Sequence, residues 1–266
     1  MARLSGKNGS VLVASQLIDD CEDAWVTAGA GRVSSLDNTD YKVGSGSAKM
    51  VTTAIGATTL LHTEDFGAMD LTGYTHLMAW VKSSINQVAG DCQILLDDTA
   101  ACASALETLA IPALVAGTWK YVTIALVTPA ALGAVISVGL KQIVDLADMS
   151  MWLDDIRAAK AIAGIRAWTL EEAAEVVDVT GFDHAGISAF IPTVMKWSGS
   201  FEGFKDGAPL AIGSVVGLEL RESQTATQQY RGSAIITGCS DKVDITGAVM
   251  YSYTFQGTHG LERATA

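Results

Sequence analysis

The feature that most constrains this chain is a strictly alternating run within the segment VDVTGFDHAGISAFIPTVMKWSGSFEGF, residues 177–204. One side of the run carries Val194, Lys196, Ser198, Ser200 and Glu202. The other side carries Met195, Trp197, Gly199, Phe201 and Gly203. A period of two is that of a β-strand with one packed and one solvated face. The run therefore predicts a strand whose Trp197 side packs into a core.

The surroundings of this strand carry no recognisable catalytic chemistry. A strand-like stretch ends at Thr180, and the loop from Gly181 to Pro192 that follows is rich in small residues. The paired carboxylates of the chain, such as Glu171-Glu172, are sequence neighbours and lack the facing geometry of acid–base pairs. The four histidines are scattered, and no glycine-rich phosphate loop precedes a helix. We therefore expect no enzymatic activity.

The same stretch resembles the tail tube proteins of long-tailed bacteriophages. The resemblance rests on Asp-Val-Thr-Gly-Phe at 178–182, Phe-Ile-Pro at 190–192 and Trp-Ser-Gly-Ser-Phe-Glu-Gly-Phe at 197–204. The start MARLSGKNG and the strand around Trp168 also match the family, whereas Ile-Pro-Thr-Val stands where the family has Pro-Gly-Leu. The resemblance covers residues 1–14 and 162–266. Residues 15–161 are then a second domain inserted into the first, which exposed loops tolerate.

The inserted segment predicts an all-β sandwich, because short strand patterns alternate with turn signals and helical periodicity is almost absent. The expected strands are 17–25, 41–51, 70–82, 92–97, 117–124, 136–144 and 149–158. Their order resembles the jelly rolls of carbohydrate-binding modules. The whole chain is thus expected to be all-β: a tail-tube-like β-sandwich or barrel with one short helix, interrupted by an inserted jelly roll.

The second resemblance implies two kinds of ligand for the insert. Such jelly rolls hold a structural calcium, for which Glu22 and Asp155 are the candidate ligands and Asp154 a weaker one. The alternative is a solvated acidic edge. Such modules also stack exposed aromatic rings on sugars, so host glycans are a candidate partner. Trp80 and Trp119 lie within apolar alternation and are expected in the core, whereas Tyr41 and Tyr74 adjoin turns.

Composition limits the remaining classes. The 266 residues, 49% of them apolar, suffice for two modest domains with real cores. The net charge is −12: residues 15–160 contain 8 basic and 17 acidic residues, and the rest of the chain contains 9 basic and 12 acidic residues. This acidic balance argues against tight nucleic-acid binding. The polar start predicts no signal peptide, and the four cysteines predict reduced thiols. The uncharged run 121–140 predicts two buried strands rather than a membrane span.

The C-terminal part predicts strands at 215–220, 228–237 and 249–255, with Tyr251, Tyr253 and Phe255 on one face. Glu219 and Arg221 are expected at an exposed strand end. Residues 206–212 are expected to start the short helix, and 261–266 to be a loose tail.

The first resemblance implies a structural virion protein, the major tail tube protein. Its copies form stacked hexameric rings around a channel through which DNA passes without tight binding, and the jelly roll is displayed outward. The expected partners are further copies, other tail proteins and no membrane, with assembly in the host cytoplasm. The expected subunit contacts are made by Phe182, Ile187, Phe190 and Ile191. A capsid decoration or head–tail protein and a glycan-binding host-attachment protein remain as alternatives.

Overall fold

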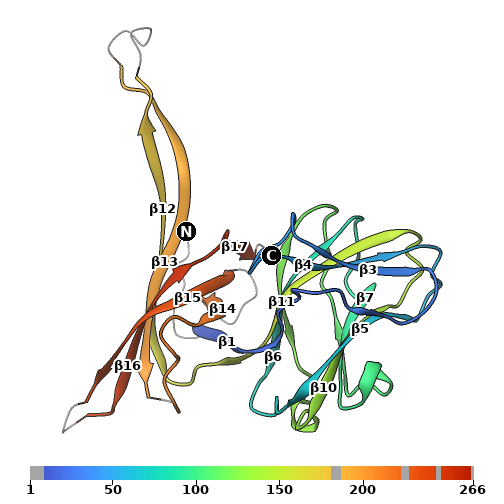
Figure 1. The fold of residues 1–266 in the computed structure, drawn as a ribbon. Helices are drawn as coiled ribbons and strands as arrows, with labels where there is room; N and C mark the ends of the chain where they lie inside the picture. Colours follow the sequence, from blue (N-terminus) through green and yellow to red (C-terminus); the bar gives the residue numbers. More distant parts are fainter. Residues whose placement is uncertain (1–8, 181–186, 206, 223–227, 244–246, 265–266) are drawn as a thin grey trace. The chain divides into compact units, whose positions relative to one another are not determined.

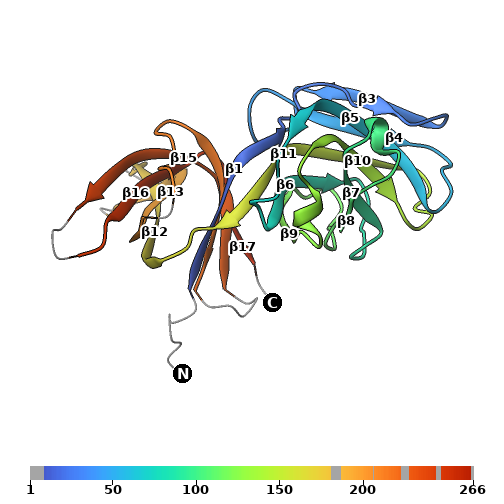
Figure 2. The same cartoon turned by 90° about the horizontal axis from the view of Figure 1, so that it is seen from below.

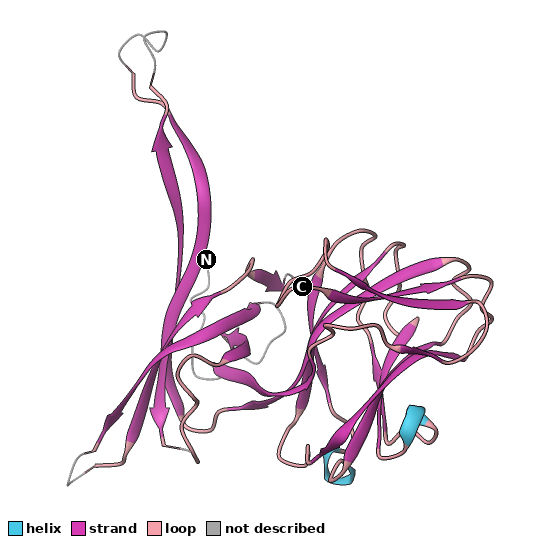
Figure 3. Cartoon of the chain, viewed as in Figure 1, coloured by secondary structure: helices cyan, strands magenta, loops and turns pink. Residues whose placement is uncertain are grey.

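The computed structural model describes residues 9–180, 187–205, 207–222, 228–243 and 247–264. Within these ranges the chain is built from strands, with two short 3₁₀ helices, Ala100–Cys102 and Pro129–Ala131 (Figures 1 and 3). The predicted all-β fold class is confirmed. The chain divides into two compact units. Unit 1 is Met1–Leu12 with Ile162–Ala266, and unit 2 is Val13–Ala161.

Unit 2 consists of two antiparallel sheets. One contains the second part of β1 (Ser10–Asp19) and strands β11, β4 and β3 in that order, with β6 paired to β11 and β9 paired to β6. The other has the order β2-β5-β10-β7-β8. The strands are β2 (Val26–Thr27), β3 (Arg32–Asp37), β4 (Ser47–Thr52), β5 (Thr59–Met69), β6 (His76–Ser83), β7 (Cys92–Asp97), β8 (Glu107–Ala110), β9 (Lys120–Ala125), β10 (Val135–Gln142) and β11 (Met149–Ala161).

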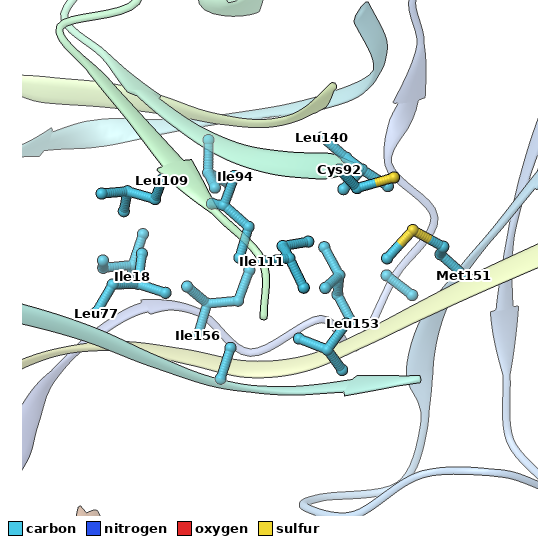
Figure 4. Packing of buried hydrophobic residues seen from close by; sticks show 14 of the residues in the cluster. Ile18, Leu77, Cys92, Ile94, Leu109, Ile111, Leu140, Met151, Leu153 and Ile156 are labelled. Atoms are coloured by element: carbon cyan, nitrogen blue, oxygen red, sulfur yellow. The ribbon is translucent and has the colours of Figure 1, made fainter. Parts of the chain in front are cut away.

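The core of unit 2 lies between its two sheets. Alternate residues of each strand point inward, as in Leu77, Ala79 and Val81 of β6 and Ile94 and Leu96 of β7, all of them fully buried. Figure 4 shows the side chains of the two layers pointing toward each other. This strict alternation is why the sequence pattern located most of these strands.

The uncharged run 121–140 resolves into β9, the 3₁₀ turn at Pro129–Ala131 and the first part of β10. The prediction of two buried strands is therefore confirmed. In the part of the chain that the structure describes, no helix has the length and apolar character to cross a membrane.

Unit 1 is organised around a strongly twisted antiparallel sheet with the order β12-β13-β16-β15-β14-β1, and β17 pairs with β15 (Figure 2). Its strands after β1 are β12 (Ile165–Asp178), β13 (Phe190–Phe204), β14 (Val215–Arg221), β15 (Gln229–Lys242), β16 (Met250–Gly257) and β17 (Glu262–Ala264).

The buried face of this sheet is aromatic. Phe201 of β13 stacks beside Tyr253 and Phe255 of β16, with ring centroids 5.0 and 6.2 Å away, and Trp197 lies 5.8 Å from Phe255. Trp197 and Phe201 are 4% and 1% exposed, so the predicted packing of that side of β13 is confirmed for both. Tyr251, Tyr253 and Phe255 are buried on one face, also as predicted.

Several local expectations differ from the structure. Residues 190–192 were expected in a loop but are the first residues of strand β13, paired with β12. Met195 shares the packing side of β13 with Trp197 but is 80% exposed, because the core ends before it. Glu219 is buried rather than exposed, and its carboxylate accepts hydrogen bonds from Arg221 and, at 2.7 Å, from Arg231. The described residues 207–212 form bends and irregular structure that lead into a turn, not a helix. Residues 262–264 are not loose, because they pair with β15 as β17.

Candidate subunit interface

Strands β12 and β13 form a long hairpin that extends beyond the rest of the sheet of unit 1 (Figure 1). Their register runs from Ile165 opposite Gly203 to Asp178 opposite Phe190. Strand β16 pairs with β13 only over Ser198–Phe204. Within the described residues the part of β13 before Ser198 therefore pairs with β12 alone, and β12 is the edge strand of the sheet.

The base of the hairpin is fixed by Trp197 and by glycines that leave room for aromatic rings. A Cβ on Gly257 would lie 2.0 Å from the indole of Trp197, and one on Gly232 would lie 2.7 Å from it. The indole N–H donates to the His259 carbonyl at 2.6 Å. Gly199 has the same role beside Phe255, whose ring a Cβ would meet at 2.7 Å. Close aromatic packing thus requires glycine at 232 and 257 and contributes at 199, where the Thr169 carbonyl also leaves no room for a Cβ.

The outer half of the hairpin carries large apolar side chains in water. We call them the tip surface: Val176, Val177, Val179, Ile187, Phe190, Ile191, Val194 and Met195, each at least 41% exposed. Exposed apolar side chains gathered on one short segment make the tip surface a candidate interaction site. A two-stranded ribbon is also marginally stable without a packing partner.

Three of the four predicted contact residues belong to this surface. Ile187, Phe190 and Ile191 are 73%, 58% and 50% exposed, and Ile191 pairs across the hairpin with Val177. Phe182 lies outside the described residues. The sequence reasoning missed the valines of β12 and Met195. The run Val176-Val177-Asp178-Val179 indicated a strand. It did not show that both faces of this strand are exposed.

The opposite face of the sheet is polar. We call it the polar face: Thr169, Glu171, Ser198, Ser200, Glu202, Ser252, Thr254 and Gln256, which register pairs align across β12, β13 and β16. The Thr169 and Ser200 hydroxyls lie 2.9 Å apart, as do those of Thr254 and its β15 neighbour Thr237. The sheet thus presents small hydroxyl and carboxylate groups on one side and aromatic rings on the other.

The predicted calcium ligands lie in unit 2, where each carboxylate has hydrogen-bond donors. Glu22 accepts from the backbone N–H and hydroxyl of Ser45, both at 2.6 Å. Asp155 accepts from the Arg157 Nε at 2.7 Å, and Asp154 accepts through Oδ2 from the backbone N–H of Lys42 at 2.6 Å. No group of three or more His, Cys, Asp or Glu side chains within the described ranges is arranged to hold a metal ion.

One observation supports the calcium hypothesis. Asp154 is buried, its Oδ1 has no hydrogen-bond partner, and burial together with the charges of Asp155 and Glu22 raises its pKa to about 7. A buried carboxylate oxygen without a donor is the type of group that a hard cation would satisfy. Calcium at Glu22 and Asp155 stays a prediction.

Most aromatic residues of unit 2 are buried or packed against its core, whereas Trp119, expected in the core, is only partly buried. Trp80 and Tyr121 are buried with ring centroids 4.9 Å apart, and the indole N–H of Trp119 donates to Asp40 at 2.6 Å. Trp80 is thus buried as predicted, and Tyr74 packs against the core. Tyr41, 38% exposed, is the one aromatic side chain among the large exposed groups described in this unit. Glycan binding by the insert stays a prediction.

The cysteines are free, as predicted, and Cys21, Cys92 and Cys102 are buried. Burial raises the pKa of the Cys92 thiol to about 12 and that of Cys102 to about 11. Both thiols are therefore protonated near neutral pH and poor nucleophiles.

No protein-family model and no curated protein matches the sequence. Two solved structures of a gene transfer agent align with part of the chain. One is a chain from the tail of an empty particle with C6 symmetry, and the other is from the virion of a native particle. Each alignment covers 41% of this chain and 87% or 89% of the other, with 22% identity and a TM-score of 0.35. The similarity is therefore distant and limited to part of the chain.

Proposed function

We propose that this protein is a structural component of a bacteriophage-like virion, and specifically its major tail tube protein. Copies assemble into stacked hexameric rings around a channel for DNA, and unit 2 is displayed on the outside. The partners are further copies of the chain and other tail proteins. The observation that carries the proposal is the tip surface of the β12–β13 hairpin, which leaves Phe190, Ile191 and Met195 in water.

The hairpin favours self-assembly for two physical reasons. Burying apolar surface stabilises a complex by about 25 cal/mol per Å². Covering the exposed tip surface with a partner would therefore lower the free energy of the assembled state. An uncovered edge strand such as β12, 14 residues long, also offers a row of backbone groups to a neighbouring chain. In an oligomer both features become contacts between subunits.

The polar face is suited to line a channel. Over Ser198–Glu202 of β13 and the residues paired with them, it presents serine and threonine hydroxyls with Glu171 and Glu202; Val194 and Lys196 lie further out on the same side of the strand. A wall with carboxylates repels phosphates rather than neutralising them, so DNA can pass without tight binding. The signature around Trp197 supports the same function, because it resembles that of tail tube proteins over residues 197–204.

The test is assembly of the purified protein. Negative-stain electron microscopy of the wild type should show rings or tubes with sixfold symmetry. The double variant Phe190→Ser, Ile191→Ser should remain folded by circular dichroism and elute as a monomer in size-exclusion chromatography, because interface energy concentrates in buried apolar anchors.

The matched control removes two exposed apolar side chains of unit 1 outside the hairpin. Ile212 and Val243 are 65% and 75% exposed, and their change to serine should leave assembly intact. A wild-type protein that stays monomeric at high concentration would refute the proposal. Threefold or twofold particles would favour a capsid decoration protein, and binding of unit 2 on a glycan array would favour host attachment.

A further inference from the structure

Met195 on β13 differs from the other methionines of the chain in its exposure. It is 80% exposed, whereas the other methionines within the described residues are buried or half-buried: Met50, Met69, Met78, Met149, Met151 and Met250. Four of these six are at most 3% exposed. A soluble reagent therefore reaches the thioether of Met195 more freely than that of any other methionine that the structure describes.

The surroundings of Met195 leave its side chain open. It borders a groove of about 340 Å³ at the base of the hairpin. It lies two residues from Trp197 toward the tip and opposite Ala174 of β12, beyond the part of β13 that pairs with β16. The methyl group of Ala174 is too short to cover a long thioether chain, so the sulfur stays accessible from the groove.

Met195 lies on the side of the hairpin that continues the core. Alternation along β13 places Ile191, Met195 and Trp197 on one side of the strand. Trp197 is 4% exposed at the base, and Ile191 is 50% exposed in the tip surface. Met195 therefore joins the covered and the uncovered parts of one apolar side.

An accessible thioether reacts with hydrogen peroxide by taking up one oxygen atom. A sulfur lone pair attacks a peroxide oxygen, the O–O bond breaks and hydroxide leaves. The S–OH group passes its proton to the hydroxide, which gives a sulfoxide and water. The sulfur loses the two electrons that the peroxide gains. A polar, chiral group then stands where the side chain was apolar and flexible.

We propose that Met195 is an oxidation site, at which peroxide converts the free subunit into a form that does not assemble. The inference rests on the proposed function, because it names a way of regulating the same surface. A sulfoxide oxygen is a hydrogen-bond acceptor, and covering it with apolar side chains leaves it without a donor. The oxidised tip surface is therefore more stable in water than under a partner.

Assembly and oxidation then exclude each other. A contact that covers Met195 keeps peroxide from its sulfur, so assembled protein is protected and free subunits are sensitive. Oxidation consequently acts between synthesis of the chain and its assembly, and it removes subunits without unfolding them.

The test uses the full chain in a Cys239→Ser background, which removes the one cysteine that is not buried. Free subunits are treated with limiting hydrogen peroxide, and peptide mass spectrometry locates the added oxygen. Met195 should be oxidised before Met69 and Met250. The oxidised protein should keep its circular dichroism spectrum and elute as a monomer, whereas untreated protein forms particles visible by electron microscopy. Particles treated after assembly should stay reduced at Met195.

Two matched variants show which methionine is responsible, each compared with itself before and after peroxide. Met250→Leu, in the same unit, should lose assembly on oxidation as the parent does. Met195→Leu should assemble to the same extent before and after treatment. If Met195→Leu does not assemble at all, repair decides: methionine sulfoxide reductases for both epimers should restore assembly of the oxidised parent.

Three results would overturn the inference while the proposed function stands. They are particles formed by protein oxidised at Met195, an oxygen that enters another methionine first, and assembly that the reductases do not restore. A reduced protein that never assembles would instead refute the proposed function, and the inference with it.

Discussion

The two units of this chain differ in how completely the apolar faces of their sheets are covered. Unit 2 covers the inner face of each sheet with the other, and 27 buried residues form its continuous apolar cluster. Unit 1 covers its aromatic face only over the base of the β12–β13 hairpin and leaves the outer half bare. A unit with a closed core needs no partner, whereas the exposed Phe190 and Met195 of unit 1 are the side chains that the proposed assembly would cover.

This difference suggests that the two units have separate roles. Because unit 2 has its own apolar core, we expect it to fold without support from unit 1. The chain enters and leaves it at adjacent points, since the Ile162 N–H donates to the Val11 carbonyl at 3.0 Å. Insertion at such closely spaced ends costs the host fold little.

The largest effect expected is the survival of each unit after separation. Residues 13–161 alone should fold as a monomer with one cooperative melting transition. Leu12 joined to Ile162 by a short Gly/Ser linker should give a unit 1 that circular dichroism shows to be folded. If both truncated proteins are unfolded, the two units depend on each other for stability.

A core substitution in each unit sharpens the comparison. Trp197→Ala removes a 4% exposed indole and should destabilise unit 1 by about 3–5 kcal/mol, whereas Ile94→Ala should destabilise unit 2 by about 2–5 kcal/mol. Calorimetry of the full chain should show each variant lowering a different transition. If both variants lower one shared transition equally, the units unfold as one.

Sequence periodicity predicted the elements that pack on a neighbouring layer. Strand β7 was predicted with its observed bounds, because its inward residues alternate under a second sheet. Strand β5 was missed, since its residues are buried only in the first half and TLLHTEDFGAM then becomes mixed. The edge strand β3 has no buried residue and was missed for the same reason.

The candidate interface shows the limit of the same reasoning. Alternation placed Met195 correctly on the side of Trp197, but it cannot tell where along a strand the covering layer ends. That boundary is set by strands far apart in sequence, here by the end of β16 at Gly257. The exposed residues Phe190 and Ile191 were predicted from the apolar content of the segment 181–192 together with the family resemblance, whereas Val176 and Val177 carry no comparable signal.

Calcium should change the thermal stability of unit 2 and not that of unit 1. If Glu22 and Asp155 bind the ion, a calcium concentration 100 times the dissociation constant would stabilise unit 2 by about 2.7 kcal/mol and leave the transition of unit 1 unchanged. Glu22→Gln with Asp155→Asn should remove the shift, whereas Asp70→Asn, at an exposed turn, should keep it. Equal shifts in wild type and double variant, measured by differential scanning fluorimetry, would exclude these ligands.

The smallest effect expected is a pH dependence confined to unit 2. His62 of β5 is buried, and burial together with the nearby Arg32 charge lowers its pKa to about 4. Between its unfolded value near 6.5 and about 4, the unfolded chain binds a proton that the folded unit does not, so His62 costs stability as the pH falls through this window. Glu64, two residues away, opposes this, because burial and nearby carboxylates raise its pKa to about 7. The measurement is therefore a difference: the stability of His62→Gln relative to wild type should increase from pH 7 to pH 4.5. A difference that stays constant over this range would show that His62 is protonated equally in both states.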